Sequence, residues 1–364
     1  MGSGSSSWLA RAVAALLLVT SLALIACAPQ SASAGQRSAA LDALTLPLDT
    51  TTPTASITPS VTASVTASVT PSVTPVLPSV GSNGPPPAPP YVAATAVELY
   101  DATNGKMLYS RSPDLSLPMA STTKIMTAVV ALTYGKLDQM ITVGQDVVNI
   151  EDGGTSVAGL RLGERLSLHD LLYCLMLPSG DDAAIAIADG VGGSQASFVA
   201  LMNLEAGLLG LSHTHYANPH GLDAPGHYTS VSDLVRLTQY AMHSPTFAQI
   251  VDTPSLTLPA TATHHQFVLV NTNELLPNEP FTYSGAIGVK TGYTGPAQYC
   301  LVFMARRPSG VLIGAILGDA TYDGRFTDAS ALLDWAYSQL SPTPTPTASA
   351  SPTASPSPSA STTP

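Results

Sequence analysis

The chain has 364 residues, of which 45% are hydrophobic and 10% charged, and its formal net charge is −11 at pH 7. This length allows one or two domains, and the negative charge argues against nucleic acid or an anionic lipid surface as a partner. The three cysteines, Cys27, Cys174 and Cys300, have spacings that fit neither a zinc site nor a redox pair.

Residues 1–27 resemble an export signal. The charge of Arg11 precedes an apolar run, residues 12–26, which is short for a membrane span, and Cys27 follows it. The sequence LIAC at this point resembles the lipobox of bacterial lipoproteins, which implies cleavage before Cys27 and lipid attachment to its sulfur. Cleavage near residues 31–35 and an uncleaved anchor are the alternatives. In each case we expect the protein to be exported, either anchored at the outer face of the cytoplasmic membrane or held in the cell wall.

Low-complexity sequence follows the signal and also ends the chain. Residues 28–90 are rich in Thr, Ser, Pro and Val and contain the tandem repeat SVTASVTASVTPSVTP, and residues 341–364 have a similar Pro/Thr/Ser composition. Such segments cannot bury enough apolar surface to offset the entropy lost on ordering. We therefore expect a disordered linker and a disordered tail, with one catalytic domain, residues 91–340, between them.

The body begins and ends with strand patterns. Residues 95–110 alternate apolar and polar around Asn104-Gly105, which predicts a β-hairpin. Helices are predicted around Ser121 and over 167–177, 181–191, 195–210, 230–242 and 328–340, and strands over 285–294, 297–306 and 310–319. Strands at both ends and helices between them predict an α/β (α+β) fold, in which the terminal strands meet in one antiparallel sheet with a helical region on one side.

The segment MASTTKIMTA, residues 119–128, places Ser121 and Lys124 three residues apart among small and apolar neighbours. On a helix this spacing brings the amine of Lys124 beside the hydroxyl of Ser121. A lysine that burial keeps neutral can remove the proton of a serine and make it a nucleophile. The alternative is a capping serine and a solvated lysine, since S-x-x-K alone is a common pattern.

Two further motifs follow in order. PSGDDAA places Ser179 between two apolar helical patterns, and VKTGYT places Lys290 in a predicted strand. Read alone, Ser179 is a helix cap and Lys290 an edge-strand lysine. Together with Ser121 and Lys124, they supply the nucleophile, the base, a proton donor for the leaving group and a cation for the substrate, which are the needs of acyl transfer.

With THYANPHGLD, residues 214–223, these motifs resemble the serine D-alanyl-D-alanine carboxypeptidases of peptidase family S11, which are low-molecular-mass penicillin-binding proteins. The resemblance implies a transpeptidase/β-lactamase-like fold, removal of the terminal D-Ala from peptidoglycan stem peptides, and covalent inhibition by β-lactam antibiotics. A DD-endopeptidase, a β-lactamase and a non-catalytic wall-binding or penicillin-binding module are the alternatives. No clear E-x-x-x-N loop of the lactamases lies between Ser179 and Lys290.

The resemblance also implies roles for individual residues. Ser121 attacks the substrate carbonyl, Lys124 takes its proton, and Ser179 passes a proton to the departing amine. The oxyanion is held by the backbone N–H groups of Ser121 and Tyr293. The substrate-binding residues that it implies are Asp181, Lys290, Thr291, Gly292, Tyr293 and Arg325. Lys290, with Thr291, holds the substrate carboxylate or polarises the site. Arg325 matches an arginine that the family places near this carboxylate, and a surface charge at the start of a helix is the alternative for it.

Asp181 departs from the family pattern, which usually has asparagine at this position. An ionised aspartate only accepts hydrogen bonds, whereas asparagine also donates. Its charge near Lys124 favours the ammonium form and so weakens the base. A slower enzyme, a protonated Asp181 that donates, and a rearranged loop in which Asp182 matters more are the three alternatives.

Four histidines, His213, His215, His220 and His227, cluster within one loop as metal ligands do. No H-E-x-x-H spacing accompanies them. The resemblance accounts for His220 and His227 without a metal, and we therefore expect neither a metal nor another cofactor.

Overall fold

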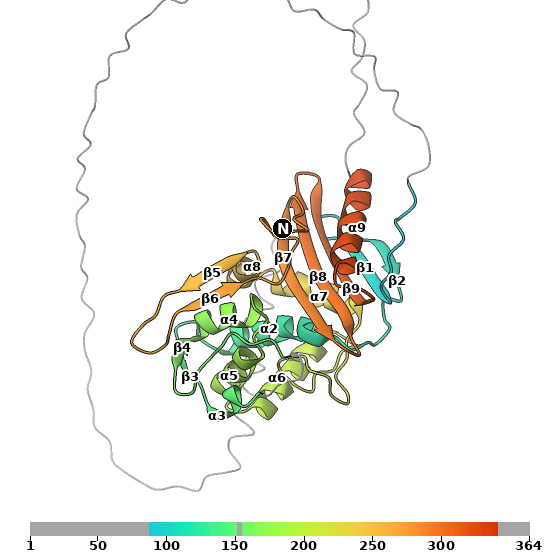
Figure 1. Cartoon of the computed structure of the whole chain (residues 1–364). Helices are drawn as coiled ribbons and strands as arrows, with labels where there is room; N and C mark the ends of the chain where they lie inside the picture. Colours follow the sequence, from blue (N-terminus) through green and yellow to red (C-terminus); the bar gives the residue numbers. More distant parts are fainter. Residues whose placement is uncertain (1–86, 151–154, 341–364) are drawn as a thin grey trace, which may run out of the picture. The chain divides into compact units, whose positions relative to one another are not determined.

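The computed structural model describes residues 87–150 and 155–340 (Figure 1). The expected export signal with Cys27, all but the end of the linker, and the tail lie outside these residues, so the domain boundaries stay predictions. Among the described residues, no single helix has the length and apolar character to cross a membrane, and only a bent pair, Asp181–Gly192 and Gln195–Leu208, at 86° to each other, meets that test jointly.

Five antiparallel strands form the main sheet in the order β2-β1-β9-β8-β7. Their bounds are β1 Ala96–Asp101, β2 Lys106–Arg111, β7 Ala286–Thr294, β8 Gln298–Arg307 and β9 Gly310–Asp319. The first strand of the body pairs with the last, which confirms the expectation that both ends of the body meet in one sheet.

The predicted hairpin joins β1 to β2 through a four-residue loop rather than a two-residue turn. The side chain of Asp101 accepts hydrogen bonds from the N–H groups of Thr103 at 2.9 Å and Asn104 at 3.2 Å. Gly105 closes the loop with a φ of +69°, a conformation that glycine adopts without strain.

Helices cover both faces of the sheet, whereas the order of elements along the chain predicted a helical region on one side. Alternate residues of β8 point in opposite directions, so that Leu301 and Phe303 pack in one core and Val302 and Met304 in the other. Helix α9, Gly324–Leu340, covers the first face, and helix α7, Val231–Ala241, packs on the second (Figure 1).

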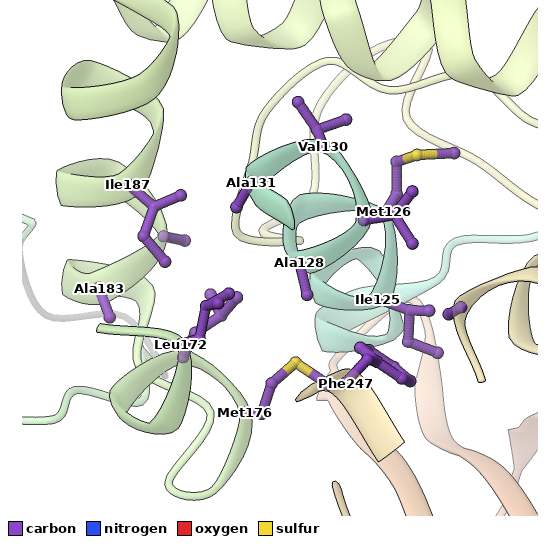
Figure 2. Close-up of a cluster of buried hydrophobic side chains, with 14 of the residues drawn as sticks. Ile125, Met126, Ala128, Val130, Ala131, Leu172, Met176, Ala183, Ile187 and Phe247 are labelled. Atoms are coloured by element: carbon purple, nitrogen blue, oxygen red, sulfur yellow. The ribbon is translucent and has the colours of Figure 1, made fainter. Parts of the chain in front are cut away.

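The helical region is built around α2. Its members are α2 Lys124–Tyr134, α3 Gln145–Val148, α4 Leu168–Met176, α5 Asp181–Gly192, α6 Gln195–Leu208, α7 and α8 Pro245–Val251. Figure 2 shows α2 presenting Ile125 and Ala128 to a cluster that includes Leu172, Ile187 and Phe247. Complete burial of each large apolar side chain contributes about 1.5–3 kcal/mol. This packing holds the start of α2 rigidly.

The structure contains two small sheets that the sequence patterns did not predict. One pairs β3 (Met140–Thr142) with β4 (Arg165–Ser167), and the other pairs β5 (Ser255–Leu258) with β6 (Phe267–Val270). Segments of three or four residues are too short to show a clear alternation of apolar and polar residues.

Candidate active site

Ser121 lies in a 3-10 turn, η1 (Ala120–Thr123), and α2 begins only at Lys124. The expected helix around Ser121 is therefore wrong in its start, but residues i and i+3 eclipse in a 3-10 turn and the predicted contact is kept. The Nζ atom of Lys124 lies 2.8 Å from Oγ of Ser121. The hydroxyl of Thr123 donates to the carbonyl of Ala120 at 2.7 Å and holds the turn.

Lys124 is fully buried. Besides Ser121, its Nζ donates to Oδ1 of Asp181 at 2.5 Å and to the carbonyl of His220 at 2.7 Å. Burial lowers the pKa of Lys124, and the carboxylate of Asp181 opposes this effect. Three acceptors match the three N–H groups of an ammonium, so Lys124 must give up a proton before it can act as a base.

A cavity of about 180 Å³ opens beside Ser121. Of the residues expected from the sequence, it is lined by Ser121, Ser179, Asp181, Thr291, Gly292, Tyr293 and Arg325. Lys124 and Lys290 are buried beneath the lining: Lys124 contacts the lining residues Ser121 and Asp181, and Lys290 contacts the carbonyl of Thr291. Segments far apart in the sequence thus converge on one site.

Other lining residues were not singled out by the sequence reasoning: Ser156, Gly221, Leu222, Thr272, Thr294 and Tyr322. Gly221 and Leu222 belong to the THYANPHGLD motif, which marked the segment but not their place at the cavity. Thr272 joins the site because its Oγ1 lies 2.6 Å from Oγ1 of Thr291, a contact between distant segments that no local pattern reveals.

The backbone is unusual on both sides of the cavity. Ala120, just before the serine of the S-x-x-K motif, has a φ of +46°, and Ser179 has a φ of +66°. Non-glycine residues in this region are strained and persist where their surroundings hold them. Ser179 is buried, in the turn that precedes α5.

Two basic side chains, Lys290 and Arg325, contact the backbone of the cavity residues Thr291 and Gly292. Lys290 is fully buried, with Nζ donating to the carbonyl of Thr291 at 3.1 Å, and burial, reinforced by the nearby charges of Lys124 and Arg325, holds its pKa well below the usual range. Arg325 donates to the carbonyl of Gly292 at 3.3 Å. A carboxylate bound beside Lys290 and Arg325 would favour their protonated forms, so this pair suits an anionic ligand.

Two glycines let the backbone approach Ser121. A Cβ on Gly292 would lie 3.1 Å from the backbone nitrogen of Ser121. A Cβ on Gly221, whose φ is +108°, would lie 2.1 Å from the carbonyl oxygen of Ala120, which is impossible without a shift of the chain. Gly292 therefore allows β7 to pack against η1, besides any contact with substrate.

The clustered histidines have structural partners. Nδ1 of His227 accepts the N–H of Ala217 at 3.0 Å, so its Nε2 carries the proton and donates to Oγ1 of Thr123 at 2.8 Å. Nδ1 of His220 accepts the N–H of Leu222 at 3.2 Å. Within residues 87–150 and 155–340, no group of three or more His, Cys, Asp or Glu side chains is arranged to hold a metal ion.

These contacts predict a loss of stability in acid. Burial lowers the pKa of His220 and of His227 from 6.5 to about 4, and the charge of Lys124 adds to this effect. Protonation would also turn each accepting Nδ1 into a donor that faces an N–H group. Such groups stabilise the fold above pH 6.5 and lose that contribution as the pH falls toward 4. The full shift corresponds to about 3 kcal/mol for each histidine.

Urea unfolding between pH 4 and 7.5 measures this effect. We expect His227→Gln, which cannot be protonated, to flatten the pH dependence of the free energy of unfolding. His243→Gln is the control, since the exposed His243 side chain bonds to the carbonyl of Gln239 in its own turn, at 2.7 Å. Equal slopes for wild type and His227→Gln would contradict the assignment.

A serine beside a buried lysine, in a cavity that Arg325 lines and that has Lys290 buried next to it, is suited to covalent acyl transfer from a substrate that carries a carboxylate. The family model described as Peptidase_S11, D-alanyl-D-alanine carboxypeptidase, matches residues 84–321. The chain belongs to this family.

Characterised relatives agree. The chain is 36% identical to a D-alanyl-D-alanine carboxypeptidase of Streptomyces sp. over 68% of this chain and 89% of the relative. It is 33% identical to DacF of Bacillus subtilis over 69% of this chain, and spans 64% of that relative. The crystal structure of a Streptomyces DD-transpeptidase matches with a TM-score of 0.65 and 35% identity, over 69% of this chain and 99% of that one.

Proposed function

We propose that this protein is a serine-type D-Ala-D-Ala carboxypeptidase that removes the terminal D-Ala from peptidoglycan stem peptides through an acyl-enzyme on Ser121. The observation that carries this assignment is the contact of 2.8 Å between Oγ of Ser121 and Nζ of the fully buried Lys124. Membership of the S11 family supports the substrate class.

Acylation begins when Lys124, in its neutral form, takes the proton of Ser121 and Oγ attacks the carbonyl carbon of the penultimate D-Ala. The carbonyl oxygen becomes an oxyanion, which the N–H groups of Ser121 and Tyr293 stabilise. As the C–N bond breaks, Ser179 gives its proton to the departing amine and recovers one from Lys124. Water then hydrolyses the ester and restores Ser121.

The cationic side of the cavity anchors the substrate. The terminal carboxylate lies near Lys290, Thr291 and Arg325, so that the scissile carbonyl reaches Ser121. The guanidinium of Arg325 suits this role because it is held against the ring of Tyr322, 4.5 Å from its centroid, and planar cations bind carboxylates with two parallel hydrogen bonds.

Fluorescent penicillin tests the assignment, because a β-lactam acylates the same nucleophile. Mass spectrometry of the digested adduct is expected to place the label on the peptide that contains Ser121. A defined pentapeptide and a cross-linked dimer, digested in parallel, distinguish a carboxypeptidase from an endopeptidase. Label on another residue would refute the proposed nucleophile.

A transpeptidase is the second candidate, because a matching structure bears that name. In that reaction an amine, rather than water, resolves the ester on Ser121. Adding a free amino acid or amine acceptor to the pentapeptide assay decides between them: a transpeptidase forms the exchanged peptide, and a carboxypeptidase forms mainly the tetrapeptide.

We further propose that the protein acts outside the cytoplasmic membrane, anchored by lipid on Cys27. Two or more acyl chains hold a protein stably on a membrane, whereas one chain does not. We expect the exported protein to partition into the detergent phase of Triton X-114, and Cys27→Ala to lose this behaviour or to stall during processing. Cys174→Ala, which removes a buried thiol, is the control. A wild-type protein that stays in the aqueous phase would rule the anchor out.

A further inference from the structure

A second acidic side chain of α5, Asp182, is 3% exposed and does not line the cavity. Its carboxylate accepts hydrogen bonds from four backbone N–H groups. Oδ1 accepts from Ala158 at 2.9 Å and from Ala183 at 2.8 Å, and Oδ2 accepts from Gly159 at 2.9 Å and from Leu160 at 3.0 Å. Three of the four donors are consecutive, so one side chain fixes the backbone of residues 158–160.

The segment of residues 156–160, called the rim segment below, connects Asp182 to the site. Ser156 lines the cavity, and its carbonyl accepts the N–H of Asp181 at 2.7 Å. The N–H of Ser156 donates to Oδ2 of Asp181 at 3.3 Å, while Oδ1 of Asp181 holds Lys124. The carboxylate of Asp181 is thus oriented by Lys124 on one side and by the rim segment on the other.

We infer that Asp182 is a positioning residue for catalysis, which holds the rim segment so that Asp181 keeps its orientation toward Lys124. Hydrogen bonds from N–H groups to a carboxylate are about twice as strong as those between neutral groups. A buried carboxylate whose donors move away keeps the cost of leaving water without the hydrogen bonds that offset it, so the rim segment is held firmly in place. Its place in the first turn of α5 adds a favourable interaction with the helix dipole. The two neighbouring aspartates therefore have different roles. Asp181 contacts Lys124, and Asp182 fixes the segment that orients Asp181.

This inference rests on the proposed function, since the orientation of Asp181 affects the reaction only if Lys124 is the base. The charge of Asp182 also raises the pKa of Lys124 directly, so loss of the charge alone would move the pH at which Lys124 becomes neutral. Asp182→Glu keeps this charge, and a shift of the midpoint in that variant therefore reports positioning, whereas a purely structural Asp182 would change only the stability of the fold. The pH dependence of acylation separates the two roles.

The test compares Asp182→Asn, Asp182→Glu and Asp233→Asn in the full chain. Asparagine keeps one acceptor oxygen and turns an NH₂ group toward the N–H donors, so it releases the rim segment. Asp233 is a matched control, because it is also 3% exposed in the first turn of a helix and accepts a loop N–H, that of His213 at 2.8 Å. Circular dichroism reports the folded fraction, and fluorescent penicillin reports the acylation rate per folded molecule from pH 5 to 10.

We expect Asp182→Asn to move the midpoint of the pH profile to lower pH by at least about half a unit, because a displaced Asp181 stabilises the ammonium form of Lys124 less. Above that midpoint, where Lys124 is neutral in every variant, the acylation rate should fall about tenfold, because Lys124 is held less firmly against Ser121. Asp182→Glu, which keeps the charge and both oxygens on a longer arm, should shift the midpoint in the same direction by less. Asp233→Asn should melt at a lower temperature and keep the wild-type midpoint.

If Asp182→Asn does not fold, the acylation rate and pH midpoint of Asp182→Glu test the inference instead. A folded variant of Asp182 with the wild-type rate and midpoint would overturn the inference. A wild-type protein that is not acylated by penicillin and releases no D-Ala would instead refute the proposed function, so the two failures are distinguishable.

Discussion

Replacing Ser121 with alanine is expected to abolish both covalent labelling by penicillin and release of D-Ala, a loss of roughly a thousandfold or more. The change removes the oxygen that forms the acyl bond in the proposed mechanism. The hydroxyl lies at the edge of the cavity and contacts Lys124 alone among the contacts described for it. We therefore expect the thermal unfolding midpoint to change little.

The matched control is Ser232→Ala, which removes a serine hydroxyl bonded to Asp114 outside the cavity. It should retain both labelling and D-Ala release. The measurements are in-gel fluorescence after penicillin treatment and an enzymatic assay for free D-Ala. Persistent covalent labelling of Ser121→Ala would show that another residue is the nucleophile.

Replacing Asp181 with asparagine is expected to raise activity at neutral pH by roughly tenfold. The carboxylate of Asp181, 2.5 Å from Nζ of Lys124, favours the ammonium form, whereas burial favours the neutral amine. Asparagine keeps the shape but removes the charge, so the pKa of Lys124 falls further. The proposed mechanism requires neutral Lys124, and the limb of the pH profile that rises with pH should therefore move to lower pH.

The pH dependence of kcat/KM for D-Ala release measures this shift. Asp233→Asn removes another buried carboxylate, one bonded to Thr214 rather than to Lys124, and should leave the limb in place. If the profiles of Asp181→Asn and wild type overlay, the charge of Asp181 does not control Lys124. The departure of this chain from the asparagine of its family would then need another explanation.

The Ser121–Lys124 contact could be predicted because it is local. A spacing of three residues gives nearly the same juxtaposition in a 3-10 turn as in an α-helix, so the expectation survived the error in where α2 begins. The pairing of the first and last strands followed from their positions along the chain, since strands separated by helices close into a common sheet.

Long-range contacts set the limit of the sequence reasoning. Neither the position of Thr272 against Thr291 nor that of Ser156 against Asp181 has a local signal. The separate orientations of two adjacent aspartates could not be inferred either, because consecutive residues of a helix point about 100° apart and only the fold decides what each one meets. The resemblance to a family marked the segments, and the structure gave their contacts.

The position of β7 at the end of the sheet order has a consequence for recognition. One backbone edge of this strand is not used by another strand of the sheet, and its residues Thr291 to Thr294 line the cavity. An extended peptide can add to such an edge through main-chain hydrogen bonds alone. The affinity of such binding depends on the direction of the peptide backbone and on the chirality of each Cα, because these determine on which side of the strand a methyl group projects. If the stem peptide of the proposed reaction adds to β7 in this way, selection for D-residues and tolerance of different side chains earlier in the stem would both arise from the same strand.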